Sequence, residues 1–259
     1  MRADHTVELP IHDGGVEVGA RGRGRQHRGA QTIGADPVVN VVCGGPNVGS
    51  ALAAHPHVAM VSVTGSPRTG HAVARAAADR FARVHLELGG NALSSDLRGR
   101  RSRHDRRPAD LGRAPRAVVD LLAGAPAYAK IVAGGDAPAR DGFYLEPTVV
   151  AGLRQDDELV QSEIFGPVIT VQSYRDDDEA IAMANGVEQG LTASVWTDSH
   201  SRAMRFLRDL EFGAVSVNTH APMGSELPHG GFGSSGYGKD LGSYGLDDYT
   251  RIKHVVHAL

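Results

Sequence analysis

The stretch VSVTGSPRTGHAVARAAADRFARVHLELGG, residues Val61–Gly90, decides the fold of this chain. Its apolar start predicts a short buried strand over Val58–Val63, and the sequence Thr64-Gly65-Ser66 then ends that strand. An alanine-rich, amphipathic helix is predicted over Thr69–Arg80, and a second strand over Arg83–Leu88. With a further strand predicted at Val38–Val42 and a short helix at Asn47–Ala54, this βαβαβ order predicts parallel strands joined by right-handed crossovers.

The turn before the helix has the chemistry of an anion site. A helix start offers N–H donors and the positive end of the helix dipole, which suits a pyrophosphate. Gly65 allows close approach of the backbone, and Ser66 can cap the helix or bond an oxygen. Glu87 lies at the carboxyl end of the second strand, where open α/β sheets place ligands and catalytic groups. On pattern alone, a plain turn with a serine cap and a solvated acid remain the alternatives.

Four motifs resemble those of the NAD(P)-dependent aldehyde dehydrogenase superfamily, in the order that the family has them. They are VTGSPRTG (Val63–Gly70), LELGGNA (Leu86–Ala92), QSEIFGPVITV (Gln161–Val171) and PHGGFGSSGYGKDLGSYGLDDYTRIKHV (Pro228–Val255). The last motif is similar to the tail of bacterial aminoaldehyde dehydrogenases, above all the gamma-aminobutyraldehyde type. The resemblance covers residues 37–93 and 117–259.

The resemblance implies an α/β fold with a partial Rossmann-type cofactor domain over residues 37–93 and a second, catalytic-type α/β domain over residues 117–259. Helices at Val118–Lys130, Asp176–Ala184 and Ser199–Leu210 and strands at Thr148–Val150, Val168–Tyr174, Ala193–Trp196 and Ala214–Asn218 are predicted in the second domain. Residues 1–36 are unassigned and expected to be disordered. Residues 94–116 are expected to be an arginine-rich insert or linker.

The resemblance also implies the roles of single residues. Glu87 corresponds to the glutamate that activates water in the oxidation of an aldehyde to its acid. The cofactor is assigned to Gly65, Ser66, Leu88, Glu163 and Phe165. Of these, Glu163 corresponds to the carboxylate that holds the nicotinamide ribose, and Phe165 to the ring beside the nicotinamide. The implied cofactor is NAD, with NADP as the alternative, and the implied substrate is a small aldehyde.

The nucleophile of the family has no counterpart in the expected place. The chain has one cysteine, Cys43, which precedes Glu87, whereas the nucleophile of the family follows the glutamate motif. The residues that hold the adenosine ribose and the asparagine of the oxyanion hole are also missing. We therefore expect a fragment with little or no activity. The alternative is an inactive module that binds the cofactor or another subunit.

Arginine is concentrated in two segments. The chain has 24 arginines and three lysines, and half of the arginines lie in Gly19–Ala30 and Asp96–Arg116. Neither segment shows an apolar period, which favours solvated chain, and out-of-frame or deleted coding sequence in GC-rich DNA is a hypothesis for their origin. A nucleic-acid binder is the third interpretation, but the segments lack interleaved aromatic residues.

Composition sets the remaining bounds. The net charge of -3 gives no general attraction to nucleic acid or to anionic membranes, and no apolar run reaches the length of a membrane span. One cysteine excludes a disulfide framework and favours the cytoplasm. The 13 histidines lack metal-ligand spacing, so no metal site is expected. The C-terminal tail is expected to allow homo-oligomers.

Overall fold

The computed structural model describes residues 6–12, 15–16, 42, 44–90, 93–96, 109–110, 115–138, 144–220 and 222–258. Cys43, the segment Gly19–Ala30 and most of Asp96–Arg116 lie outside the described residues, as does the strand predicted at Val38–Val42 apart from its last residue. Among the described residues, no helix has the length and apolar character that a membrane crossing requires.

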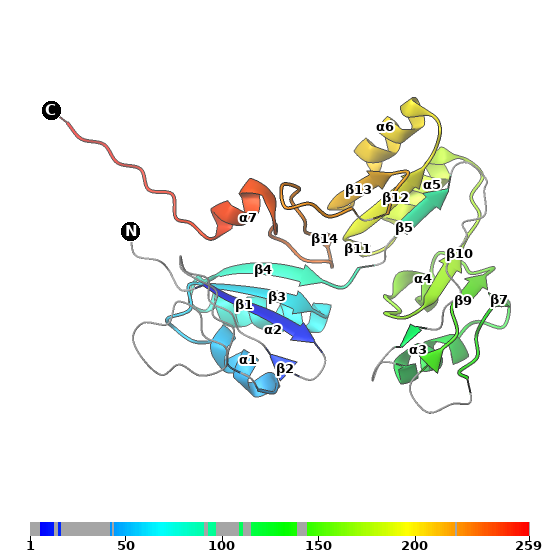
Figure 1. Ribbon diagram of the computed structural model, residues 1–259, viewed down its shortest axis with the longest axis horizontal. Coiled ribbons are helices and arrows are strands. Elements are labelled where there is room, and N and C mark those ends of the chain that lie inside the picture. The colour runs from blue at the N-terminus through cyan, green and yellow to red at the C-terminus, as the bar shows by residue number, and fades with distance from the viewer. Residues whose placement is uncertain are drawn as a thin grey trace.

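The first sheet and the helices on it contain the stretch Val61–Gly90. Its strand order is β2-β1-β3-β4, with the bounds Gly15–Val16, Thr6–His12, Met60–Gly65 and Arg83–Leu88. The strand β3 pairs parallel with β1 and with β4, as expected for a βαβ unit. Helices α1 (Pro46–Ala53) and α2 (Pro67–Ala78) lie against one face of the sheet (Figure 1). The predicted strand Arg83–Leu88 is confirmed in both bounds.

Apolar side chains of β3, β4 and the two helices form the core of this unit. Because strand side chains alternate between two faces and helical ones recur every three to four residues, these elements present one apolar face each. The buried members are Ala53, Val58, Val61, Val63, Val73, Leu86 and Leu88.

The strand that pairs with β3 on the side away from β4 was not predicted. Residues 1–36 were expected to be disordered, but Thr6–His12 forms β1 and pairs with β3 from Thr6↔Met60 to Pro10↔Thr64. Gly15–Val16 then returns as β2, antiparallel to β1. The segment TVELPIH has alternating apolar residues but also a proline, which weakens a strand signal.

A second sheet has the order β13-β12-β5, and all its strands run parallel. The strands are Ala214–Val217, Thr192–Trp196 and Leu93–Asp96, and helices α5 (Asp177–Asn185) and α6 (His200–Asp209) accompany them. Leu93, the last residue of the predicted cofactor domain, opens β5 and packs on the core of this second unit. The sequence LSSD has one apolar residue, so its strand signal is weak.

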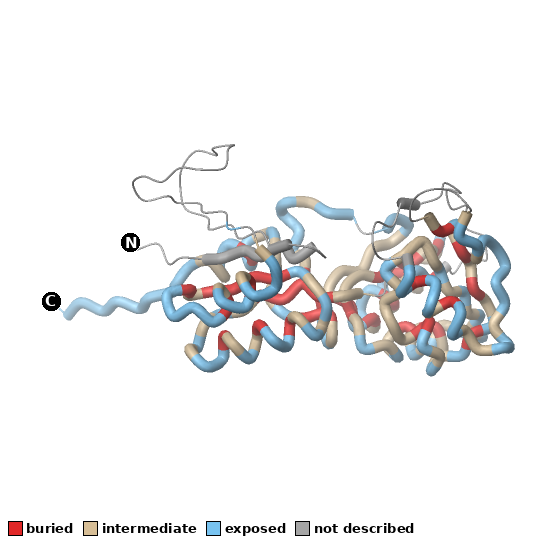
Figure 2. The backbone as a smooth tube through the Cα atoms, turned by 90° about the horizontal axis from the view of Figure 1, so that it is seen from below, coloured by how far each residue is buried: buried red, intermediate tan, exposed pale blue. Residues whose placement is uncertain are grey.

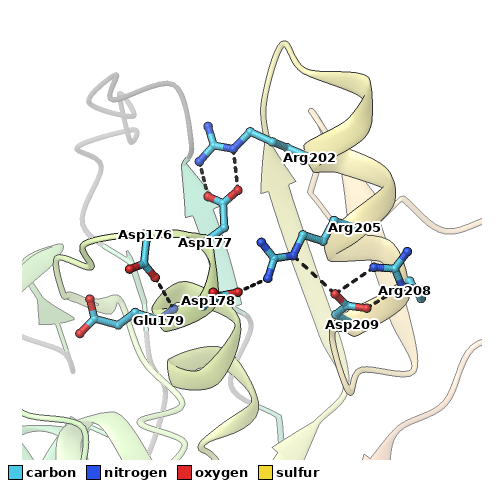
Figure 3. Close-up of polar contacts among 8 residues, drawn as sticks. All are labelled: Asp176, Asp177, Asp178, Glu179, Arg202, Arg205, Arg208 and Asp209. Atoms are coloured by element: carbon cyan, nitrogen blue, oxygen red, sulfur yellow. Dashed lines mark hydrogen bonds and ion pairs between the residues drawn. The ribbon is translucent and has the colours of Figure 1, made fainter.

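Charged side chains join α5 to α6 (Figure 3). The Nε of Arg202 donates to Asp177 at 2.9 Å, and Arg205 pairs with Asp178. Both helices begin at the predicted caps: Asp176 accepts from the N–H of Glu179 at 2.9 Å, and Ser199 accepts from the N–H of Arg202 at 3.4 Å. Because these pairs are partly exposed, they add little to stability.

A third sheet has the order β10-β9-β7, with the strands Val168–Val171, Thr148–Ala151 and Lys130–Ala133. Helices α3 (Pro115–Ala123) and α4 (Glu158–Gln161) pack on it, and Ala109–Asp110 (β6) pairs with Tyr144–Leu145 (β8). The helix predicted over Val118–Lys130 ends seven residues earlier than expected, and the predicted turn IVAGG begins as the edge strand β7. The turn itself is made by the two glycines that follow, Gly134 and Gly135, which have positive φ.

The C-terminal motif lies along the edge of β4 that faces away from β3 (Figure 1). The N–H of Leu86 donates to the carbonyl of Tyr237 at 2.8 Å, and the N–H of Leu88 donates to that of Ser235 at 3.0 Å. Gly236 between them has φ +102°, and a Cβ there would lie 2.2 Å from the carbonyl oxygen of Leu86. A glycine is therefore required for the motif to reach this strand.

The rest of the motif is held at both ends. His229 and Asp240 exchange two backbone hydrogen bonds, of 2.8 and 2.7 Å, and so close the loop between them. Within the loop, β14 (Phe232–Gly233) pairs with β11 (Gln189–Gly190). Helix α7 (Gly242–Asp248) follows, and residues 251–258 extend away from the body and are exposed (Figures 1 and 2).

Substitution of Gly236 tests whether this docking supports the fold. Gly236→Ala is expected to lower the free energy of unfolding by about 2 kcal/mol, because the new Cβ meets backbone and the residue is held in a left-handed conformation. Gly124→Ala is the matched control, because the nearest atom to a Cβ there lies at 3.5 Å and Gly124 is exposed. Urea unfolding followed by circular dichroism measures both. Equal losses in the two variants would contradict the docking.

Candidate functional site

Glu87 is the centre of the candidate site. It lies on β4 opposite Thr64 of β3, and it is buried, with 9% of the residue exposed. Its Oε1 lies 3.1 Å from Nε2 of His85, and its Oε2 lies 3.9 Å from Nε2 of His229. The carboxylate thus sits between two imidazoles, one from its own strand and one from the C-terminal motif.

Strand geometry and the docked motif explain this arrangement. Residues two apart in a strand share a face, so His85 and Glu87 point to the same side of β4. The hydrogen bonds from Leu86 and Leu88 to the C-terminal motif bring the loop from His229 to Asp240 over that side. The Oδ1 of Asp240 lies 3.4 Å from Nδ1 of His85.

Lys239 adds a cation beside this cluster. Its Nζ donates to the carbonyl of Gly230 at 2.5 Å and lies 4.8 Å from the centre of the Phe232 ring. Burial lowers the pKa of Lys239, and the nearby charge of Glu87 opposes this effect. A shallow hollow of about 390 Å³ opens here, lined by Gly231, Phe232, Tyr237, Gly238, Lys239, Tyr244, Asp247 and Asp248. A second hollow, of about 310 Å³, lies beside α1, away from Glu87.

The β3–α2 turn places Gly65 and Ser66 at the same end of the sheet as Glu87. Ser66 caps α2 as predicted, because its Oγ accepts from the N–H of Thr69 at 3.3 Å and lies 3.1 Å from Oγ1 of Thr69. Fewer amides are free than expected, since Pro67 has no N–H and the N–H of Thr69 is already bonded. The groups offered to an anion are the hydroxyl of Ser66, the helix dipole and the exposed first-turn Arg68.

Glu163 reaches the glycines that follow Glu87. A Cβ on Gly89 would lie 2.2 Å from Oε2 of Glu163, so only glycine allows this approach. Burial raises the pKa of Glu163, and a hydrogen bond from the backbone N–H of Gly90 opposes the rise. The structure therefore brings Glu163 to Gly89 and Gly90, beside Pro67 of the β3–α2 turn, although more than seventy residues separate it from these glycines in the sequence.

The other two predicted cofactor residues lie differently. Leu88 is 8% exposed and belongs to the core, where its side chain packs on Gly70 of α2. Its side chain is therefore occupied by the fold rather than presented to a ligand. Phe165 has φ +49° and is 78% exposed. The structure leaves this ring in solvent.

Sequence reasoning missed the residues that surround Glu87. It assigned no role to His85, His229, Lys239 or Asp240, and it expected no histidine to join carboxylates. One ring nitrogen of His85 and one carboxylate oxygen each of Glu87 and Asp240 lie within 4.8 Å of one another. The spacing of His85 and Glu87 on one strand was an available signal, but nothing local showed that Asp240 would close the group.

The chain matches the model of the aldehyde dehydrogenase family over residues 31–94 and 116–255. An aldehyde dehydrogenase of Emericella nidulans is 30% identical over 86% of this chain and 56% of its own length. A betaine aldehyde dehydrogenase of Bacillus subtilis is 30% identical over 84% of this chain and 57% of its own length. The chain thus spans about half the length of the curated relatives it matches.

Solved structures agree with the fold. An NAD-dependent aldehyde dehydrogenase from Sinorhizobium meliloti superposes with a TM-score of 0.74 at 28% identity, over 81% of this chain and 53% of that one. A betaine aldehyde dehydrogenase from Staphylococcus aureus, solved in complex with NAD+, superposes with a TM-score of 0.71 at 26% identity, over 78% of this chain and 52% of that one.

Proposed function

The chain belongs to the aldehyde dehydrogenase family, and from that premise we propose that it binds NAD weakly at the β3–α2 turn and has little or no aldehyde turnover of its own. The observation that carries the proposal is the convergence of the Ser66 turn, Glu87 and Glu163 at one end of the first sheet. Relatives solved with NAD+ support the choice of cofactor over NADP.

The described residues fit part of a dinucleotide. The capped start of α2, with no acidic residue in its first turn, suits the pyrophosphate. The carboxylate of Glu163 is half-buried, and the hydrogen bond from the N–H of Gly90 offsets only part of the cost of that burial. A further donor, such as a ribose hydroxyl, would suit this carboxylate. The cofactor would supply the acceptor for hydride. No residue was assigned to the adenosine, so we expect weak affinity.

Glu87 is proposed as the general base. A carboxylate with few exposed atoms and two neighbouring imidazoles can take a proton from water. The step that precedes it in the family needs a thiolate, and the only thiol in the chain precedes Glu87 in sequence. We therefore propose that turnover is weak or absent. The substrate class proposed is an aminoaldehyde, which the likeness of the tail and the named betaine aldehyde dehydrogenases support.

Cofactor binding is measurable without turnover. We expect calorimetry to give a dissociation constant for NAD on the order of 1 mM, equivalent to about 4 kcal/mol. Ser66→Asp should weaken binding at least about tenfold, because aspartate still caps the helix but repels the pyrophosphate. NADH formation from gamma-aminobutyraldehyde should stay at the background rate in the same samples.

The control is Ser199→Asp, since Ser199 caps α6 in the same way but lies in the second unit. It should leave NAD binding unchanged. Equal weakening in both variants would place the cofactor elsewhere or show a non-specific charge effect. Thiol-dependent NADH formation that is lost in Cys43→Ser would show that Cys43 is the nucleophile and would overturn the proposal of weak turnover.

The tail supports a second proposal, that copies of the chain associate into an oligomer, and the single cysteine supports the cytoplasm as the compartment. Residues 251–258 are extended, and Ile252, Val255 and Val256 are 96%, 74% and 78% exposed. Such apolar side chains on a protruding segment suit a protein interface. Sedimentation at tens of micromolar should show dimers or larger species, and a variant carrying Ile252→Asp and Val256→Asp should sediment as a monomer. The pair Lys253→Asp and His254→Asp is the control, and equal dissociation by both pairs would point to charge alone.

A further inference from the structure

We propose that His85 is a positioning residue for Glu87: its two ring nitrogens bridge Glu87 and Asp240, and the bridge holds Glu87 by Oε1 and leaves Oε2 to take a proton. The inference rests on the proposed role of Glu87 as the base. It concerns a contact that can be measured without turnover.

The bridge has a clear geometry. Nε2 of His85 lies 3.1 Å from Oε1 of Glu87, and Nδ1 lies 3.4 Å from Oδ1 of Asp240. The side chain of His85 is fully buried, that of Glu87 is 11% exposed, and that of Asp240 is 41% exposed. His85 therefore contacts a buried carboxylate through one ring nitrogen and a partly exposed carboxylate through the other.

Each carboxylate faces a different ring nitrogen. An imidazole with a proton on each nitrogen satisfies both carboxylates at once. The two carboxylates thus do not compete for the same ring nitrogen: Glu87 is hydrogen-bonded to Nε2, and Asp240 lies within ion-pair distance of Nδ1.

The surrounding charges support the doubly protonated form of His85. Burial by itself disfavours the charged imidazole, but the hydrogen bond to Glu87 and the charges of Asp240, Glu87 and Asp248 outweigh it, so the pKa of His85 is raised. From β3 the hydroxyl of Ser62 lies 3.4 Å from Nδ1 and carries no charge. His229 and Lys239 are further titratable groups near Glu87 in the described part of the chain.

The bridge has a consequence for stability. Because the pKa of His85 is raised in the folded state, the stabilisation is fully present below the ordinary histidine value near 6.5 and is lost as the pH rises through the raised value. The bridge should therefore weaken at alkaline pH, where His85 loses a proton and Glu87 loses its charged partner.

Proton NMR of the histidine rings tests the bridge directly. The wild type should show two slowly exchanging ring N–H signals from His85 at neutral pH, and titration should give a pKa above the ordinary value. Glu87→Gln and Asp240→Asn should each lower that pKa by about one unit, a tenfold change in proton affinity, because each removes one charged acceptor. His229→Gln is the matched control and should leave the His85 signals in place.

A second readout follows Glu87 itself. Carbodiimide modifies protonated carboxyl groups, so at neutral pH the modification of Glu87, followed by mass spectrometry, should be several-fold faster in His85→Gln than in the wild type or in His229→Gln. Asp240→Asn leaves the buried ring of His85 in place. If the pKa of His85 is unchanged in this variant, the bridge is overturned, even if His85→Gln fails to fold. Loss of NAD binding would leave both readouts intact, so a failure of the proposed function is distinguishable from a failure of the bridge.

Discussion

Two backbone hydrogen bonds, from Leu86 and Leu88 to the segment Ser235–Tyr237, hold the candidate site together. They satisfy the edge of β4, which otherwise offers unpaired N–H groups along a strand that carries Glu87. They also join residues about 150 positions apart in the sequence, so the first unit and the C-terminal motif share one sheet edge. His229, Lys239 and Asp240 reach Glu87 only because this edge is occupied.

Burial of the charged groups follows from the same docking. Glu87 and His85 would lie on an exposed edge strand if the motif were absent, and surface ion pairs contribute little. Once covered, an ionised carboxylate needs hydrogen bonds and an opposite charge. His85 supplies both to Glu87, and Asp240 supplies a second negative charge beside the other ring nitrogen of His85. The contacts among His85, Glu87 and Asp240 thus both allow Glu87 to be buried and hold it in place.

Local signals predicted the elements whose chemistry is local. Ser66, Asp176 and Ser199 were read as caps and accept the expected amide protons. The strand Arg83–Leu88 was predicted because its flanks and apolar residues are clear. The strands Thr6–His12 and Leu93–Asp96 were missed, since the first contains proline and the second has one apolar residue. Both segments are strands because of the strands they pair with, and the propensity of a segment carries no information about its partners.

The candidate site was predicted in part for the same reason. Glu87, Ser66 and Glu163 carry motifs and lie at one end of the sheet, whereas the side chain of Leu88 is part of the core and Phe165 lies in solvent. Asp240 and His85 are paired by tertiary contact alone. Their meeting depends on the register of the motif on β4, which no single segment specifies.

Amide hydrogen exchange along β4 tests the docking most directly. Leu86 and Leu88 donate to the C-terminal motif, and because successive amides in a strand point in opposite directions, those of His85 and Glu87 face β3. The account predicts that all four amides are protected to a similar extent. Exchange of Leu86 and Leu88 that is orders of magnitude faster than that of His85 and Glu87 would show that the edge of β4 is open and would contradict it.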